Sequence, residues 1–169
     1  MSEQNMAFHV GNKVIHWAHG PGVIIKLEEK ELSGHTNQYY VVQMHDLTLW
    51  VPISETGEHS LRLPTPVEDF QKLFHVLASP GEPLPADRLE RKTLLTERMK
   101  DGRLESICRV IRDLTFLSRS KKMNDHDNST LERARSFLLS EWSVALSVPI
   151  QQAGRELKEL LDKNISPGK

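Results

Sequence analysis

The stretch VIHWAHGPGVIIKLEE, residues 14–29, joins two apolar runs through Gly20-Pro21-Gly22. Runs of β-branched residues bounded by Gly and Pro predict two strands with a tight turn between them. Because His16 and His19 lie beside that turn, three interpretations compete: a metal site, a loop that holds phosphate, or a structural corner of a sheet.

The residue pattern favours the structural corner. His16 and His19 have a spacing found in zinc sites, but zinc needs further ligands that converge on one point. In an extended segment, positions three apart also project to opposite faces. The sequence GPGVI lacks the G-x-x-x-x-G-K-[ST] pattern of phosphate loops, and it leads into a strand rather than a helix N-terminus. We therefore expect no metal or phosphate ligand here.

Short strand-like runs continue on both sides of this corner, from Phe8 to about Arg62. Five such runs within about 55 residues are AFHV, NKVIHW, GVIIKLEE, QYYVVQMH and LTLWVPI. They predict a small antiparallel β-barrel, because closure removes the exposed strand edges of an open sheet.

After residue 64 the apolar period changes from that of strands to that of helices. Thr65 and Glu68 have the spacing of a capping box, and Pro66 lies at the first helical position. The apolar residues that follow at helical spacing are Phe70, Leu73, Phe74 and Leu77. We expect this first helix to end at SPGEPLP, residues 79–85.

Two further helices are expected before the next polar segment. One runs from near Asp87 to Lys100 and stops at Asp101-Gly102, since Gly suits the left-handed conformation after a helix end. The next carries one apolar face, made of Leu104, Ile107, Cys108, Ile111 and Leu114.

The polar segment SRSKKMNDHDN is expected to be a loop, followed by a helix capped by Ser129 and Glu132. The inward face of that helix is expected to hold Leu131, Ala134, Leu138, Trp142 and Ala145. Pro149 opens the last helix, with Ile150, Ala153, Leu157 and Leu160 inward. The expected fold class is therefore α+β, with a β-barrel domain over residues 1–64 and an all-α bundle of about five helices over residues 65–169.

Composition limits the classes of protein open to this chain. Its 169 residues are 38% hydrophobic and 27% charged, which suits one compact domain or two small ones. No apolar run approaches the ~20 residues of a membrane span, and the N-terminus has no signal-peptide pattern. We therefore expect a cytoplasmic protein without membrane contact. The lone cysteine, Cys108, excludes an internal disulfide.

Charge is distributed unevenly, although the net charge is −1. Residues 86–122 hold eleven Lys and Arg against six Asp and Glu. Such an excess is compatible with phosphate contact, but similarly charged faces are common on solvated helices.

No group of residues matches a known catalytic pattern. The chain lacks G-x-S-x-G, H-E-x-x-H and G-x-G-x-x-G motifs, and its eight histidines are dispersed. We therefore expect a binding protein with no catalytic residues, no cofactor and no metal. A small hydrolase or metal enzyme is an alternative, which stoichiometric zinc would support.

The first half of the chain resembles the N-terminal RNA-polymerase-interacting domain of the CarD/CdnL/TRCF family of bacterial transcription regulators. The recurring elements of that domain correspond here to VGNKV, HGPGVI, YYV and the VP of LTLWVPI. The segments LFHVLASP, VIRDL and ERARSFLLSEWSVAL are similar to the CarD/CdnL C-terminal domain. The resemblance covers about Phe8 to Asn164, without the ATPase motors of the repair translocase that shares the barrel.

The resemblance implies a Tudor- or SH3-like barrel that docks on the RNA polymerase β subunit, partly by adding a strand edge to edge. Carried over by position, the contact residues are Lys30, Trp50, Val51 and Pro52. Family members have arginines at the positions of Lys30 and Trp50. Lysine keeps the charge without the bidentate fork, and tryptophan offers an aromatic anchor instead. The other interpretation of Trp50 is a barrel core residue.

In the same family, the helical domain approaches the upstream edge of the transcription bubble and wedges a tryptophan into the minor groove. That position falls at or near Arg88, and no Trp, Tyr or Phe lies between His75 and Phe116. The resemblance therefore implies weak, sequence-independent contact with promoter DNA through Arg88, Arg91 and Lys92.

The implied function is a non-enzymatic transcription regulator, monomeric when free, that binds RNA polymerase and modulates the stability of the promoter open complex. The alternative is a protein-interaction adaptor that docks on the polymerase without wedging into DNA.

Overall fold

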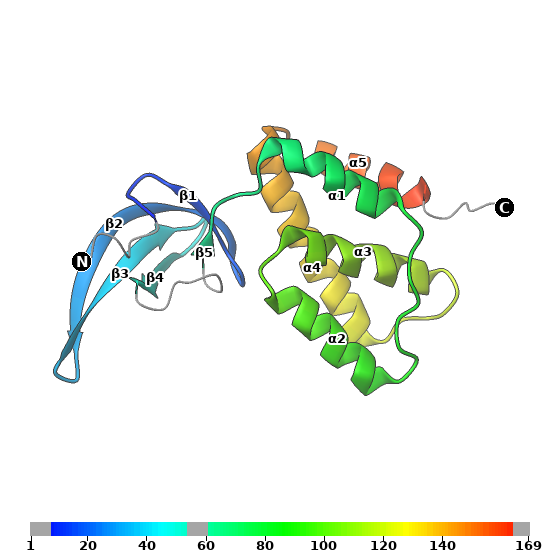
Figure 1. Cartoon of the computed structure of the whole chain (residues 1–169), viewed down its shortest axis with the longest axis horizontal. Helices are drawn as coiled ribbons and strands as arrows, with labels where there is room; N and C mark the ends of the chain where they lie inside the picture. The colour runs from blue at the N-terminus through cyan, green and yellow to red at the C-terminus, as the bar shows by residue number, and fades with distance from the viewer. Residues whose placement is uncertain (1–7, 54–60, 164–169) are drawn as a thin grey trace. The chain divides into compact units, whose positions relative to one another are not determined.

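The structure is a computed structural model, and it describes residues 8–53 and 61–163 of the chain. The chain forms two compact units, Met1–Pro64 and Thr65–Lys169 (Figure 1). The first unit is built from strands and the second from helices, so the predicted α+β class is confirmed. Within the described residues, no helix is long and apolar enough to cross a membrane.

The first unit is a five-stranded antiparallel sheet, hydrogen-bonded in the order β4-β3-β2-β1-β5. Its longest strands, β2 and β3, form a curved hairpin (Figure 1). The pairing of β2 with β3 shifts between Ile24 and Lys26, and such a bulge bends a strand. The strands are β1 (Lys13–His16), β2 (Gly20–Leu32), β3 (His35–Gln43), β4 (Thr48–Pro52) and β5 (Leu61–Arg62).

The predicted closed barrel does not form within the described residues. There, β4 pairs with β3 alone and β5 pairs with β1 alone, so both are edge strands. Of the predicted strand AFHV, the described residues 8–10 are not a strand, and Leu61–Arg62 supplies the fifth strand instead. Phe8 is a core residue, because its ring meets Tyr40 edge-on with the ring centroids 5.6 Å apart.

The turn between β1 and β2 lies earlier than predicted. Residues 17–19 form it, and Gly20-Pro21-Gly22 already pairs with β1. Gly20 has a φ of 83°, a left-handed conformation that favours glycine. A Cβ added to Gly22 would come within 2.7 Å of Val42 Cγ1, so the packing of β2 against β3 requires glycine there.

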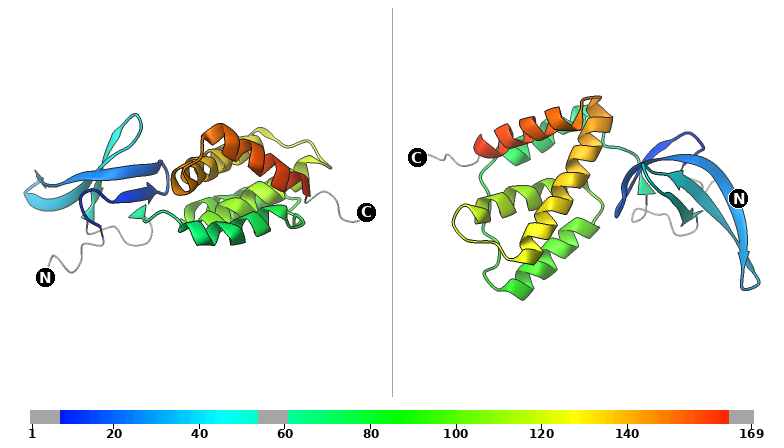
Figure 2. Two further views of the ribbon diagram at one scale, coloured as in Figure 1. Left: turned by 90° about the horizontal axis from the view of Figure 1, so that it is seen from above. Right: turned by 180° about the vertical axis from the view of Figure 1, so that it is seen from behind.

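The second unit holds five α-helices preceded by a short 3-10 helix. In this unit α1 packs against α3 and α5, and α4 packs against the same two helices (Figure 2). The predicted helical half is therefore confirmed. The elements are η3 (Val67–Asp69), α1 (Phe70–Ala78), α2 (Arg88–Lys100), α3 (Leu104–Ser118), α4 (Asp125–Leu146) and α5 (Ile150–Lys163).

The predicted inward faces form the core of this unit, with one exception in α5. Ile150 is 49% exposed, whereas Leu160 is partly buried against the core as predicted, and its neighbour Leu161 is buried as well. Trp142 lies at the centre, with its ring centroid 4.8 Å from that of Phe74. Predicted residues that are buried include Phe70, Leu73, Leu77, Leu104, Ile107, Cys108, Ile111, Leu114, Ala134, Leu138, Ala153 and Leu157.

Two predicted helix starts are wrong. Thr65 caps no helix through its side chain, and its N–H instead donates to the Glu141 carboxylate at 2.7 Å. The fourth helix begins at Asp125, because the Asn124 side chain accepts a hydrogen bond from the Asp127 N–H at 2.8 Å. The end of the expected loop is therefore the first turn of α4.

Candidate functional site

The first candidate site lies on the sheet, around Trp50. Across β2, β3 and β4, the register aligns Trp50 with Lys26 and Pro52 with Glu28. Directly opposed residues, and residues two apart along a strand, share a face of a sheet. Lys26, Glu28, Lys30, Trp50 and Pro52 therefore share the face opposite the core.

Contacts on this face hold the indole of Trp50 in place. Its Nε1–H donates to Glu28 Oε1 at 2.9 Å, and Lys30 Nζ lies 4.3 Å from the ring centroid. The hydrogen bond from Trp50, with Lys26 and Lys30 nearby, lowers the pKa of the Glu28 carboxyl. Trp50 is nevertheless 42% exposed, so it faces outward and is not a core residue.

The four expected polymerase-binding residues divide into two groups. Lys30, Trp50 and Pro52 lie together on the outward face. Val51 is 5% exposed and belongs to the core, so its side chain cannot contact a partner as expected. The reason is the alternation of side chains along a strand, which turns one of any two neighbours inward.

The edge of the sheet is part of the same site. In the described sheet β4 is an edge strand, and its side away from β3 pairs with no other strand. Pro52 ends β4, where its missing N–H costs no ladder hydrogen bond. A free strand edge and a fixed aromatic side chain are thus offered by one strand.

Sequence reasoning missed Glu28 as part of this site. The available signal was the alternation of Lys26, Glu28 and Lys30 within one strand. Their meeting with Trp50 depends on the register of three strands, which the sequence does not reveal.

The second candidate site lies at the start of α2. Asp87 caps this helix by accepting a hydrogen bond from the Glu90 N–H at 2.9 Å. Arg88 and Lys92 are exposed and lie one helical turn apart, so both charges face solvent on one side. Among the described residues, neither forms an ion pair.

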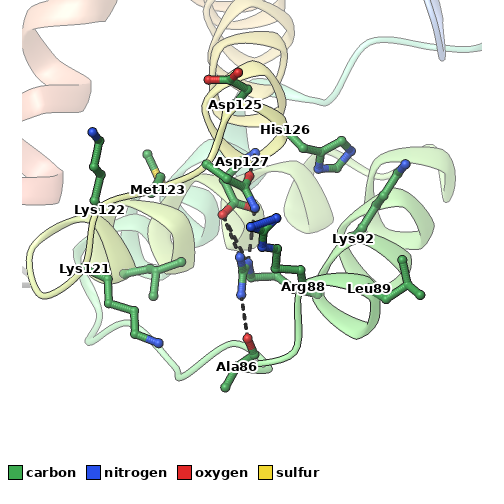
Figure 3. Close-up of a pocket in the computed structure, with 13 residues that line it drawn as sticks. Ala86, Arg88, Leu89, Lys92, Lys121, Lys122, Met123, Asp125, His126 and Asp127 are labelled. Carbon is green, nitrogen blue, oxygen red and sulfur yellow. Dashed lines mark hydrogen bonds and ion pairs between the residues drawn. The ribbon is translucent and has the colours of Figure 1, made fainter.

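Arg91 is buried, although it was expected to contact DNA. Its Nε lies 3.2 Å from both carboxylate oxygens of Asp127, and its Nη2 lies 3.0 Å from Oδ2 (Figure 3). Nη1 donates to the carbonyls of Pro85 at 3.0 Å and Ala86 at 3.3 Å. With its guanidinium occupied and only 7% of the residue exposed, Arg91 joins α2 to α4 instead of reaching a phosphate.

The histidine pair of the first hairpin differs from its prediction. His16 and His19 do not project to opposite faces, because residues 17–19 form a turn, and the ring centroids lie 5.0 Å apart. His16 Nδ1 accepts a hydrogen bond from the Ala18 N–H at 3.0 Å. Burial, and secondarily His19, lower the pKa of His16 to about 4. No group of three His, Cys, Asp or Glu within residues 8–53 and 61–163 could hold a metal.

Comparison with known proteins matches both units. The family model of the CarD-like/TRCF RID domain matches residues 8–62, and that of the CarD C-terminal domain matches residues 72–158. The chain is also similar to the putative transcription factor YdeB of Bacillus subtilis (strain 168). The two are 29% identical over 151 residues, which cover 86% of this chain and 96% of YdeB.

A sheet unit of the RID type followed by a CarD-type helical unit defines a class of two-part transcription regulators. Within that class, the chain belongs to the CarD/CdnL family, so the resemblance stated from its motifs is confirmed. Membership in the RID domain family implies an interaction with RNA polymerase.

Proposed function

We propose that this protein regulates transcription by docking on the β subunit of RNA polymerase and changing the lifetime of the promoter open complex. The observation that carries the proposal is the exposed indole of Trp50, held by Glu28 and Lys30 beside the free edge of β4. Family membership supports RNA polymerase as the partner.

The chemistry of this surface suits strand addition. Backbone hydrogen bonds along the edge of β4 supply affinity with little demand on the partner's sequence, and side chains beside the edge supply specificity. Trp50 suits the role of anchor, because an aromatic side chain already held in one orientation loses little entropy on binding. Lys30 adds a positive charge next to it, which favours carboxylates on the partner surface.

In the second half of the proposal, Arg88 and Lys92 contact the phosphate backbone of promoter DNA. Both are exposed and without an ion pair among the described residues, so neither must break a contact to bind. Contacts to phosphate carry no base information, and each one releases counterions, so this binding is independent of sequence and weakens as salt rises.

Capture of RNA polymerase on the immobilised full-length chain tests the docking. The double variant Trp50→Ala, Pro52→Ala should capture much less polymerase than wild type. Trp17→Ala is the matched control, because Trp17 is 38% exposed yet lies in the turn between β1 and β2. If the folded double variant captures as much polymerase as wild type, the surface around Trp50 and Pro52 is not the docking surface.

An adaptor that docks on the polymerase without touching DNA is the second candidate. It is favoured by the burial of Arg91 and by the lack of Trp, Tyr or Phe in α2. The lifetime of the open complex at low salt decides between the two functions. If Arg88→Ala, Lys92→Ala shortens or lengthens it relative to wild type, DNA contact is supported. If polymerase capture is intact and the lifetime is unchanged, the adaptor is the better account.

A further inference from the structure

A pocket of about 840 Å³ lies where the start of α2, the end of α3 and the start of α4 meet (Figure 3). Arg88 and Lys92 line it from α2, Lys121 and Lys122 from the segment after α3, and His126 from the first turn of α4. Two segments far apart in the sequence, the start of α2 and residues 117–127, thus bring basic side chains to one concavity.

The pocket has an excess of positive charge. Arg91 and Asp127 also line it, but they pair with each other. Four cations then remain, Arg88, Lys92, Lys121 and Lys122, against one carboxylate, that of Asp125. Among the described residues, none of these four cations forms an ion pair. In Figure 3 the Asp125 side chain lies at the top of the view and the Lys121 side chain at the lower left.

Buried contacts hold the walls of the pocket together. The Arg91–Asp127 pair joins the first turn of α2 to the first turn of α4. The Arg91 bonds to the Pro85 and Ala86 carbonyls fix the segment that enters α2. Arg88 and Lys92 therefore project from a braced helix start, and charges of one sign that line a concavity focus the electric field on an anion.

The pocket also has apolar wall. Leu89 is 72% exposed, the largest exposure among the large hydrophobic residues that the structure describes, and partly buried Leu117 and Met123 lie on the other side. Cations with apolar surface between them suit a ligand that carries phosphate on a sugar or a base.

We propose that this pocket binds the phosphate groups of a nucleic acid strand or of a free nucleotide, with Lys121, Lys122 and His126 as contacts beyond those of α2. The inference rests on the proposed function, since it concerns the same basic end of the helical unit. It extends the phosphate contact from α2 to the segment after α3 and to the first turn of α4. Arg91 holds these walls together through Asp127 and does not itself bind phosphate. The chemistry that the two ligands share is the phosphate group, and the titrations below distinguish the nucleic acid strand from the free nucleotide.

Titration of the ¹⁵N-labelled full-length chain followed by NMR tests this pocket. The probes are a short single-stranded oligodeoxythymidylate and, separately, inorganic pyrophosphate. We expect shifts at the backbone amides of Lys121, Lys122 and His126 together with those of Arg88 and Lys92. The variant Lys121→Ala, Lys122→Ala should bind about tenfold more weakly.

The matched control is Lys72→Ala, Lys100→Ala, which removes the same charge from exposed lysines of the helical unit that do not line the pocket. This control should bind within about twofold of wild type, because distant exposed charges are screened by salt. Equal losses in the two double variants would overturn the inference, since the effect would then come from net charge alone.

The remaining outcomes are also decisive. Binding of the oligonucleotide alone identifies a nucleic acid strand as the source, and binding of pyrophosphate as well extends the site to free nucleotides. Shifts confined to Arg88 and Lys92 would overturn the pocket but leave the DNA contact of the proposed function intact. An absence of shifts with either probe would overturn the pocket, whereas failure of polymerase capture would overturn the docking independently.

Discussion

Replacing Arg91 separates its structural role from a role in DNA contact. Arg91→Ala leaves the Asp127 carboxylate without its guanidinium partner, although Asp127 is only 2% exposed. Removing one member of a buried pair costs about 3–5 kcal/mol, because the other charge stays buried without compensation. Arg88→Ala is the control, since an exposed side chain without a partner changes the free energy of unfolding by no more than about 0.5 kcal/mol.

Urea and thermal unfolding measure the fall in the free energy of unfolding caused by Arg91→Ala. Far-UV circular dichroism is the suitable probe, because the helical unit dominates the far-UV signal. For a unit of this size, 3 kcal/mol corresponds to a fall in Tm of about 12 °C or more. Arg91→Lys should be intermediate, since lysine keeps the charge but loses the bidentate fork. The double variant Arg91→Met, Asp127→Leu should recover most of the loss, because no unpaired charge is left buried.

A result in which Arg91→Ala unfolds within about 0.5 kcal/mol of wild type, as Arg88→Ala does, would refute this reasoning. It would mean that the Arg91–Asp127 pair does not brace α2 against α4. Arg91 would then be free for phosphate contact, as the family resemblance implies. If Arg91→Met, Asp127→Leu is destabilised as much as Arg91→Ala, the packing between α2 and α4 has a tight steric requirement that the apolar pair does not meet.

Three further predictions concern the rest of the molecule. Because the pKa of His16 is lowered to about 4 from 6.5, the unfolded chain binds a proton that the folded chain does not. The sheet unit should therefore lose stability as pH falls from about 6.5 towards 4. Urea unfolding followed by tryptophan fluorescence measures this pH dependence, and His16→Gln should reduce it. The same pH dependence in wild type and His16→Gln would contradict the lowered pKa of His16. Gly22→Ala should destabilise the same unit by about 1–3 kcal/mol, because a Cβ would overlap Val42. An unchanged free energy of unfolding in the same assay would show that β3 shifts to accommodate the added Cβ. Burial raises the pKa of the Cys108 thiol, so a thiol reagent at neutral pH should react with Cys108 only after unfolding; fast reaction of the folded chain would place Cys108 outside the core.

The sequence predicts the helical unit well where local signals agree. Asp87 caps α2 and Gly102 follows it at a φ of 81°, as their residue types suggest. The apolar spacing of α3 and α4 also identifies the residues that form the core. These features depend on residues within a few positions of one another, so periodicity and capping rules suffice.

The misplaced start of α4 shows where local signals fail. Ser129 with Glu132 and Asn124 with Asp127 are both acceptable starts, and the sequence alone does not rank them. The structure favours the earlier one, in which Asp127 meets Arg91, a residue 36 positions away. The gain from that buried pair is tertiary, so no local rule detects it.

The candidate sites fail to emerge from the sequence for the same reason. Trp50 meets Glu28 and Lys30 only through the register of three strands, and Lys121 approaches Arg88 only through the packing of helices. The basic excess over residues 86–122 does include the four cations that line the pocket. It does not separate Arg91, which is buried, from Arg88 and Lys92, which are exposed.

Docking of the sheet unit on RNA polymerase is the central claim, and isothermal titration of the full-length chain into the isolated polymerase β lobe tests it most directly. We predict that Trp50→Ala weakens the affinity about thirtyfold, which is the effect of losing an aromatic anchor worth about 2 kcal/mol. Trp17→Ala should bind as wild type does. Equal affinities for wild type, Trp50→Ala and Trp17→Ala, all folded by circular dichroism, would contradict the account.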